Sequence, residues 1–399
     1  KQALAAVGGS TGTIINLLVG FVTGLSSGAT VVIAQFYGEN NAAGVKKTVD
    51  SGMFLGIVLG FVIMIFGYIT APNMLRMLQV PKEIFVYSLA YMRIYYVGMI
   101  PTMIYNTGAG ILRAIGDSKR PLYFLIASCL TNILLDVLFV TVIPLGIQGA
   151  AWATVISQAV FALVSFFYFL CFSKNVRFKT LKPDKSIVGE TIAIGMSAMI
   201  MQVLSLVQQT VMYSTLKKYG GEDQVVLMGA FFRYLMLSFI PLWGLSQGFQ
   251  PFVGTNFGAG LFDRVKKGTG MFYGFGLLLA VLAWGIFLLS PEKVLGLFID
   301  NPVLVAQGKT NAVIAMIIFP ALAIMILNMT LFQAIGKPKP AGILAISRQL
   351  VLFVPAVLIL PHFFGARGVW LAMPLVDGIV VVLSVIIMIK IFATDLVKK

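Results

Sequence analysis

The sequence predicts an all-α polytopic membrane protein built from two parallel, pseudo-symmetric helical lobes. Three observations lead to this fold class. The 399 residues are 59% hydrophobic and only 11% charged, whereas an ordinary soluble domain carries about 25% charged residues. Apolar runs of about 20 residues alternate with short polar loops, as spanning helices require. A long internal repeat relates the two halves of the chain.

The internal repeat has an offset of 220 positions, which slips to 219 near its end. Three blocks carry it: Gly24–Gly28 with Gly244–Gly248, Ala114–Gly116 with Ala334–Gly336, and Gly146–Gly149 with Gly365–Gly368. Repeats of this length in an apolar chain are typical of membrane proteins made of two equivalent lobes.

The apolar runs predict eleven spanning helices. In chain order they cover 4–36, 50–70, 84–112, 121–142, 147–172, 187–216, 225–258, 270–290, 304–334, 341–361 and 366–392. The first would be about 50 Å long at about 1.5 Å per residue. Because the hydrocarbon core is about 30 Å thick, this helix must tilt or protrude. No alternation typical of a membrane barrel is present.

The lysine and arginine residues are distributed among the loops as in a membrane protein with several spans. Of the 29 lysine and arginine residues, which give a net charge of +15, eighteen fall in alternate loops and in the C-terminal tail. This is the positive-inside pattern, so we expect these loops and the C-terminus in the cytoplasm. The pattern gives no indication of a nucleic-acid partner.

The repeat and the loop charges together define the predicted domains. An even number of spans separates the basic pair at 46–47 from the pair at 266–267, so the two repeats run parallel. We expect an N-terminal lobe over 1–172, a basic cytoplasmic linker over 173–186, and a C-terminal lobe with a short tail over 187–399. The helix at 187–216 has no counterpart 220 positions earlier, so a first spanning helix is expected to precede Lys1.

A polar cluster in the N-terminal lobe is the strongest candidate site. Asn132 and Asp136 are four residues apart, which places them on one helix face, and the next helix carries Thr154. Such oxygens can bind a small hard cation such as Na⁺, or form a cage that favours a protonated carboxyl. Buried polar residues in a membrane are costly and often functional. The alternative is a simple hydrogen bond between helices.

The internal repeat supports a functional role for this polar cluster. The positions equivalent to Asn132, Asp136 and Thr154 are Leu352, Ala356 and Met373. A polar cluster that occurs in only one copy of the repeat favours a functional role over a structural one.

Other intramembrane polar residues are weaker candidates for a substrate cavity. Arg348 and Asp377 could line a cavity, and Asp377 could instead pair with an arginine or stay neutral. Gln202, Gln208 and Gln209 could line the cavity or bond neighbouring helices. Arg93 and Arg233 are expected to extend to the membrane interface.

Signals of enzymatic chemistry are absent. The single histidine, His362, is expected at the surface, and no zinc, phosphate-binding or nucleophile motif occurs. Cys129 and Cys171 fall in predicted spans, where we expect packing rather than a disulfide or a metal site. Glycine-rich segments near Gly24–Gly28 and Gly254–Gly260 are expected to permit close helix approach.

Several segments together resemble the multidrug and toxic compound extrusion (MATE) transporters. They are Gly28 with Gln35–Gly38, Gln250–Gly260, Gly110–Asp117 with Pro121, Asn132–Asp136, and Gly146–Ala151. The family motif positions within them are Gln35, Gly38, Pro251, Gly254, Asn256 and Gly258. The resemblance extends over essentially the whole chain.

The resemblance implies two six-helix lobes around a central cleft and a secondary-active antiporter. It implies export of bulky, often cationic compounds in exchange for H⁺ or Na⁺, with Asn132, Asp136 and Thr154 in the cation site. Some members place an acid on the seventh helix, where this chain has Gln202 and Ser205. We expect no cofactor, a monomer among membrane lipids, and a location in the bacterial cytoplasmic membrane. A flippase for lipid-linked oligosaccharides is the alternative.

Overall fold

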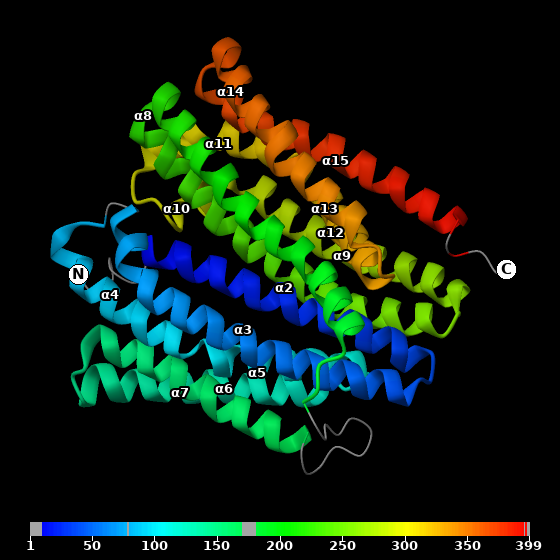
Figure 1. The fold of residues 1–399 in the computed structure, drawn as a ribbon. Helices are drawn as coiled ribbons and strands as arrows, with labels where there is room; N and C mark the ends of the chain where they lie inside the picture. The colour runs from blue at the N-terminus through cyan, green and yellow to red at the C-terminus, as the bar shows by residue number, and fades with distance from the viewer. Residues whose placement is uncertain (1–9, 78–79, 170–180, 395, 397–399) are drawn as a thin grey trace. The chain divides into compact units, whose positions relative to one another are not determined.

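The computed structural model in Figure 1 describes residues 10–77, 80–169, 181–394 and 396. Every regular element in this part of the chain is helical. The chain divides into two compact units, Lys1–Met199 and Ile200–Lys399. We call them the first and the second unit, and describe each by itself.

The first unit is a bundle of long helices. It contains α2 (Ser10–Gly38), α3 (Ala42–Met77), α4 (Lys82–Val97), α5 (Met99–Ala114), α6 (Lys119–Val137), the short π-helix η1 (Leu138–Val142), α7 (Gly146–Phe167) and the beginning of α8 (Lys185–Gly258). Helix α5 packs against α2, α3 and α7, and α7 also packs against α4 and α6.

The second unit repeats this pattern. It contains the rest of α8, then α9 (Phe262–Leu289), α10 (Pro291–Gly296), α11 (Pro302–Met316), α12 (Phe319–Ala334), α13 (Pro338–Ile346), the π-helix η3 (Ser347–Leu352), α14 (Phe353–Phe364) and α15 (Ala366–Thr394). Helix α15 packs against α11, α12 and α14. One large apolar core, which includes Phe231, Phe287 and Trp370, fills this unit.

The helices account for the eleven predicted spans. Eight described helices are long and apolar enough to cross a membrane, and two bent pairs raise the number to ten. Helix α8 has 74 residues and breaks at Gly221. Since one span needs about 20 residues, α8 supplies two spans, and the total is eleven.

Two predicted spans are not continuous helices, which corrects the sequence-based expectation. The span expected over 84–112 bends by 47° between α4 and α5, and the span over 304–334 bends by 43° between α11 and α12. Prolines explain both breaks. Pro101 and Pro320 lie in the first turn after each break, where the missing proline N–H costs no helical hydrogen bond.

The repeat is visible in the backbone as well as in the sequence. Three pairs of residues with positive φ are separated by the repeat offset: Asn40 with Gly260, Gly116 with Gly336, and Gly146 with Gly365. The two breaks also match, since Gly98 in the first unit corresponds to Ile318 in the second. The two halves therefore share turns and bends.

The repeated turns are closed by the same hydrogen bonds. After α5, Asp117 N–H donates to the carbonyl of Leu112 at 2.9 Å. After α12, Lys337 N–H donates to the carbonyl of Phe332, also at 2.9 Å. In both places a glycine in the left-handed region precedes the donor, which is the Schellman arrangement that ends many helices.

The end of the predicted linker is attached to α3. The backbone N–H of Asp184 donates to the hydroxyl of Ser51 at 3.0 Å, and its carboxylate lies 3.5 Å from the Lys47 ammonium. The same carboxylate accepts hydrogen bonds from the backbone of Ile187 and Ser186 at the start of α8. These donors, and then Lys47, lower the pKa of Asp184. Residues 170–180, with most of the linker's basic residues and with Cys171, lie outside the described part of the chain.

The beginning of α8 belongs to the first unit because it lies unusually close to α2. A Cβ atom added at Gly28 would lie 2.2 Å from the carbonyl oxygen of Thr191, and one added at Gly195 would lie 2.9 Å from that of Gly24. The spacing of Gly24 and Gly28 is the small-xxx-small pattern of closely packed membrane helices. The first compact unit thus ends at Met199, later in the chain than the predicted linker over 173–186. The predicted lobe boundary stays a prediction.

We expect Gly28→Ala to destabilise the protein, because the new methyl group would meet backbone that cannot move aside. Overpacking of this kind costs roughly 1–3 kcal/mol. The repeat provides the control: Gly248, 220 positions later, has nothing within 4 Å of an added Cβ. Thermal unfolding in detergent should therefore show a lower midpoint for Gly28→Ala than for Gly248→Ala. Equal midpoints would contradict the close contact between α2 and α8.

Much apolar surface remains exposed on the helices. Within the described residues, the most apolar window of α6 has no buried residue, and Leu134, for example, is 70% exposed. Such a surface is compatible with a bilayer, where lipid chains cover it. Cys129 is also exposed on α6, so the expectation that it packs in the interior is wrong.

Candidate cation-coupling site

Two neighbouring helices of the first unit carry the predicted site. Helix α6 presents Asn132 and, one turn later, Asp136, and the π-helical turn η1 begins two residues beyond the acid. Helix α7 starts at Gly146, whose φ of 57° allows the chain to turn back, and packs along α6. Isolated π-turns occur often at functional sites.

The structure brings Asn132 and Thr154 together. The amide Nδ2 of Asn132 lies 3.4 Å from the hydroxyl oxygen of Thr154 and donates to it. That hydroxyl in turn donates to the carbonyl of Ala150 at 3.1 Å. Thr154 is therefore held between the two helices, with its oxygen facing α6.

Asp136 has no hydrogen-bond partner in the described part of the chain. Its oxygen Oδ1 is buried without a partner, and the side chain is half-buried. Neither Asn132 nor Thr154 bonds to it in this structure. Leaving a buried carboxylate oxygen unpaired is costly, so the site has capacity to bind a proton or a small cation.

Three further polar residues, which were not singled out in the sequence, lie around these helices. Tyr91 of α4 is close enough to Asp136 for the carboxylate charge to act on its phenol. Thr102 of α5 bonds to Gln158 of α7. Gln158 follows Thr154 by one turn, so the four-residue spacing could have indicated it. Tyr91 carries no such signal, because the chain has 13 tyrosines.

The second unit has a different polar group between the equivalent helices. Arg348, in η3, donates through Nε to Oδ1 of Asp377, in α15, at 2.7 Å. The side chains are only 23% and 10% exposed. Asp377 therefore pairs with an arginine, one of the alternatives for this residue, and its charge is compensated.

The remaining substrate-cavity candidates lie along α8. Gln202, Ser205 and Gln208 are half-buried, and Gln209 is exposed. The Ser205 hydroxyl donates to the carbonyl of Gln202 at 2.7 Å, within its own helix. Their place in a substrate cavity stays a prediction.

Of the other residues singled out in the sequence, Arg93 lies inside α4, and Arg233 and His362 are exposed. Arg93 is half-buried, with its guanidinium 4.9 Å from the ring centre of Tyr68. Arg233 is exposed, and so is His362, whose Nε2 lies 3.3 Å from the Tyr219 hydroxyl.

The family motif residues surround the ends of α2 and α8. Gly38 and Gly258 are the last residues of these helices, and Gln35 is half-buried one turn earlier. In α8, Pro251 and Gly254 are buried, and the Asn256 amide donates to the carbonyl of Phe252 at 2.8 Å. The family motif residues thus lie beside the ends of α2 and α8, where the two halves of the chain have equivalent turns.

Helical spans throughout the described residues, a parallel internal repeat and an intramembrane acid without a counter-charge in the first unit together have the architecture of a membrane transporter. A sequence model of the family described as MatE matches residues 1–138 and 197–358, which together are well over half of the chain. The chain belongs to the MatE family. It is therefore a multi-pass membrane transporter and not an enzyme.

Two named relatives support the family assignment over most of the chain. This chain is 29% identical over 392 residues to the probable multidrug resistance protein YoeA of Bacillus subtilis, covering 94% of this chain and 82% of the relative. It is 24% identical over 378 residues to the multidrug export protein MepA of Staphylococcus aureus, covering 94% and 83%.

Solved structures share the fold. A multidrug resistance MATE family transporter of the MOP superfamily in an outward-facing conformation has a TM-score of 0.93 at 22% identity, covering 99% of this chain and 89% of that one. A MOP superfamily transporter from Pyrococcus furiosus also has a TM-score of 0.93 at 22% identity, covering 100% and 90%. At this identity the likeness shows the fold alone, and the two-lobed fold class is confirmed.

Proposed function

We propose that this protein is a secondary-active multidrug exporter that exchanges its substrate for H⁺ or Na⁺ at Asp136. The family membership supports transport, and the names of YoeA and MepA support multidrug export. We propose bulky, cationic amphipathic compounds as the substrates. The same relatives favour this function over the flippase alternative.

One observation carries the coupling part of the proposal. The acid of the first unit, Asp136, has a buried carboxylate oxygen without a partner, whereas Asp377 in the second unit is neutralised by Arg348. A carboxylate that lacks a counter-charge gains most from binding a cation, because its desolvation is otherwise uncompensated. Coupling by a single site in the first unit is the simplest consequence.

The proposed cycle uses differential affinity for the cation. Binding of H⁺ or Na⁺ neutralises Asp136 and favours a rearranged first unit with lower affinity for the drug. The drug leaves on the outer side, and return to the inward-open state releases the cation. A cation can shift the protein between two states only if it binds them with different affinity. Asn132 and Thr154 supply neutral oxygens beside the acid.

The topology is part of the same proposal. The basic loops, including the Lys46 and Lys47 region, would face the cytoplasm under the positive-inside rule. The C-terminus would then be cytoplasmic in a bacterial inner membrane, and the functional unit would be a monomer without a cofactor.

Drug uptake into proteoliposomes with separately imposed gradients tests the coupling. With the protein in both orientations, we expect a dye-like cationic drug to accumulate when H⁺ or Na⁺ is concentrated inside the vesicle. The ion whose gradient drives accumulation identifies the coupling ion, and an ionophore for that ion should abolish it. Equal transport without any gradient would contradict antiport, and transport driven only by added nucleotide would contradict secondary-active coupling.

A further inference from the structure

A chain of hydrogen bonds joins three helices in the interior of the second unit. The hydroxyl of Tyr273 in α9 donates to Oδ1 of Asn328 in α12, and Nδ2 of Asn328 donates to the hydroxyl of Ser384 in α15 at 3.0 Å. That hydroxyl donates to the carbonyl of Val381 at 2.8 Å. Asn328 and Ser384 are fully buried. We call Tyr273, Asn328 and Ser384 the polar triad, and a buried network in which every member has a partner makes the packing rigid.

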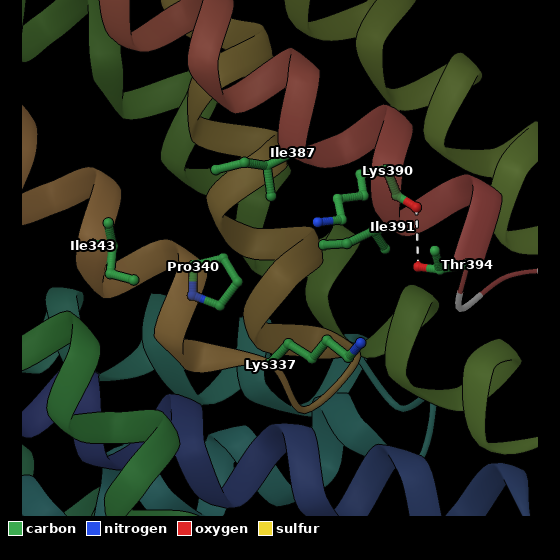
Figure 2. A pocket seen from close by; sticks show the side chains of 7 residues that line it. All are labelled: Lys337, Pro340, Ile343, Ile387, Lys390, Ile391 and Thr394. Atoms are coloured by element: carbon green, nitrogen blue, oxygen red, sulfur yellow. Dashed lines mark hydrogen bonds between the residues drawn. The ribbon is translucent and has the colours of Figure 1, made fainter.

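The polar triad fixes α15 beside a less closely packed region. Ile387 follows Ser384 by one turn. Together with Ile391 of α15 and Ile343 of α13, it lines a cavity of about 330 Å³ (Figure 2). The hydrogen bond from Asn328 thus attaches α15 to α12 where open space begins beside α15.

The first unit replaces the polar triad by a contact that lacks its hydrogen bonds. The equivalent positions hold Met53, Gly108 and Ser165, the last at the offset of 219. Gly108 of α5 lies against Ser165 of α7, since a Cβ atom added at Gly108 would be 3.6 Å from the Cβ atom of Ser165. The Ser165 hydroxyl is buried and has no hydrogen-bond partner within the described part of the chain. At this level α5 and α7 are therefore held by close contact alone.

A hydrogen bond between the same two helices lies nearer the proposed cation site. Thr102 of α5 is bonded to Gln158 of α7, and Thr102 precedes Gly108 by about 9 Å along α5 at about 1.5 Å per residue. Gln158 follows Thr154 of the cation site by one turn. A change at the cation site thus reaches α7 beside this bond, which leaves the contact between Gly108 and Ser165 free to shift.

From this asymmetry we propose that binding of H⁺ or Na⁺ at Asp136 shifts α5 relative to α7 at Gly108 and Ser165, whereas Asn328 keeps α12 and α15 fixed. The inference rests on the proposed function and names the part of the first unit that rearranges. The Ser165 hydroxyl supports it, because a buried group without a partner in one arrangement gains by finding one in another. The members of the polar triad are already bonded, so a shift of α12 against α15 would only break bonds.

Two engineered disulfides of matched geometry test the proposal. Gly108→Cys with Ser165→Cys joins α5 to α7, and Gly276→Cys with Ala323→Cys joins α9 to α12. In each pair a Cβ atom at the glycine is 3.6 Å from the partner's Cβ atom, within the range of about 3.5–4.5 Å found in disulfides. In a protein with its natural cysteines replaced by serine, oxidation of the first pair should abolish ion-driven export into proteoliposomes. Oxidation of the second pair should leave export unchanged.

The rate of disulfide formation separates this inference from export itself. Between ion-free and ion-loaded protein, we expect the rate for the first pair to change by about fivefold or more. The rate for the second pair corrects for the effect of pH on the thiols and should otherwise stay constant. Asp136→Asn should remove the ion dependence of the first pair.

The possible outcomes separate the shift from the exporter function. An ion-dependent rate without any export would support the shift and contradict the proposed exporter. Equal rates for the first pair in both states, or undiminished export after its oxidation, would overturn the shift. Loss of export in both oxidised pairs would overturn the asymmetry between the units.

A substitution without added bulk provides a second reading of the polar triad. Asn328→Ala removes both hydrogen bonds of its central residue, so backbone amides of α12 and α15 should exchange hydrogen about tenfold faster. Ser165→Ala is the control, because it removes a hydroxyl without a partner at the position equivalent to Ser384. It should leave exchange in α5 and α7 unchanged. If Asn328→Ala does not accelerate exchange, the triad does not fix the second unit and the proposal is wrong.

Discussion

Substituting Asn for Asp136 should abolish drug export while leaving the protein in the membrane. The amide keeps the shape of the side chain but removes its charge, so no cation can bind differently in the two states of the first unit. Drug accumulation in proteoliposomes is expected to fall to that of vesicles without protein, at every pH and Na⁺ concentration.

The control is an acid outside the proposed site. Asp223 is exposed near the break in α8, so Asp223→Asn should transport like the wild type. Matching levels of both variants in the membrane would exclude a folding defect. Undiminished ion-driven export by Asp136→Asn would remove this carboxyl from the mechanism, although the fold and the family would stand.

Replacing Arg348 with Met should strongly destabilise the second unit. The substitution leaves the carboxylate of Asp377 buried and without its partner, and breaking a buried pair in this way costs roughly 3–5 kcal/mol. We expect a much lower unfolding midpoint in detergent. The double variant Arg348→Met with Asp377→Leu should recover most of the loss, because no buried charge then remains.

An exposed pair in the same unit provides the comparison. Lys217 and Glu222 lie 3.1 Å apart but are 65% and 82% exposed. Lys217→Met should therefore cost at most about 1 kcal/mol. If Arg348→Met is no more destabilising than Lys217→Met, the buried ion pair between Arg348 and Asp377 does not stabilise the second unit. If the double variant stays as unstable as Arg348→Met, lost packing and not the unpaired acid explains the effect.

The fold could be predicted largely from apolar patterning and the internal repeat. Span length, loop charge and the 220-residue offset led to the all-helical class, the eleven spans and two equivalent halves. The bends at Gly98 and near Ile318 do not follow from apolar patterning, because that pattern runs through both without interruption. Pro101 and Pro320 are the signals that could have indicated them, because a proline inside a predicted span interrupts the helix that precedes it.

The sequence predicts which site residues share a helix face, because their spacing determines it. It does not predict how neighbouring helices are rotated toward each other. Asn132 and Asp136 share a face by their spacing, and Thr154 lies on the next helix, so their proximity follows from two adjacent antiparallel helices. The pairing of Arg348 with Asp377 joins residues 29 positions apart, and the sequence does not fix how the two helices are turned. The expectation that Cys129 serves in packing failed for a related reason, because apolar residues surround most of α6 and hydrophobicity does not distinguish a packed face from a lipid-facing one.

The ion pair in the second unit has a consequence for how the two halves diverged. The halves share bends, turns and capping bonds, so a duplicated ancestral unit could be retained without redesign of its backbone. A few side-chain changes then suffice to make the halves different: Asn132 and Asp136 correspond to Leu352 and Ala356 in the second half, which carries the Arg348–Asp377 ion pair instead. On a shared backbone, one half can thus keep an acid without a counter-charge while the other half compensates its acid.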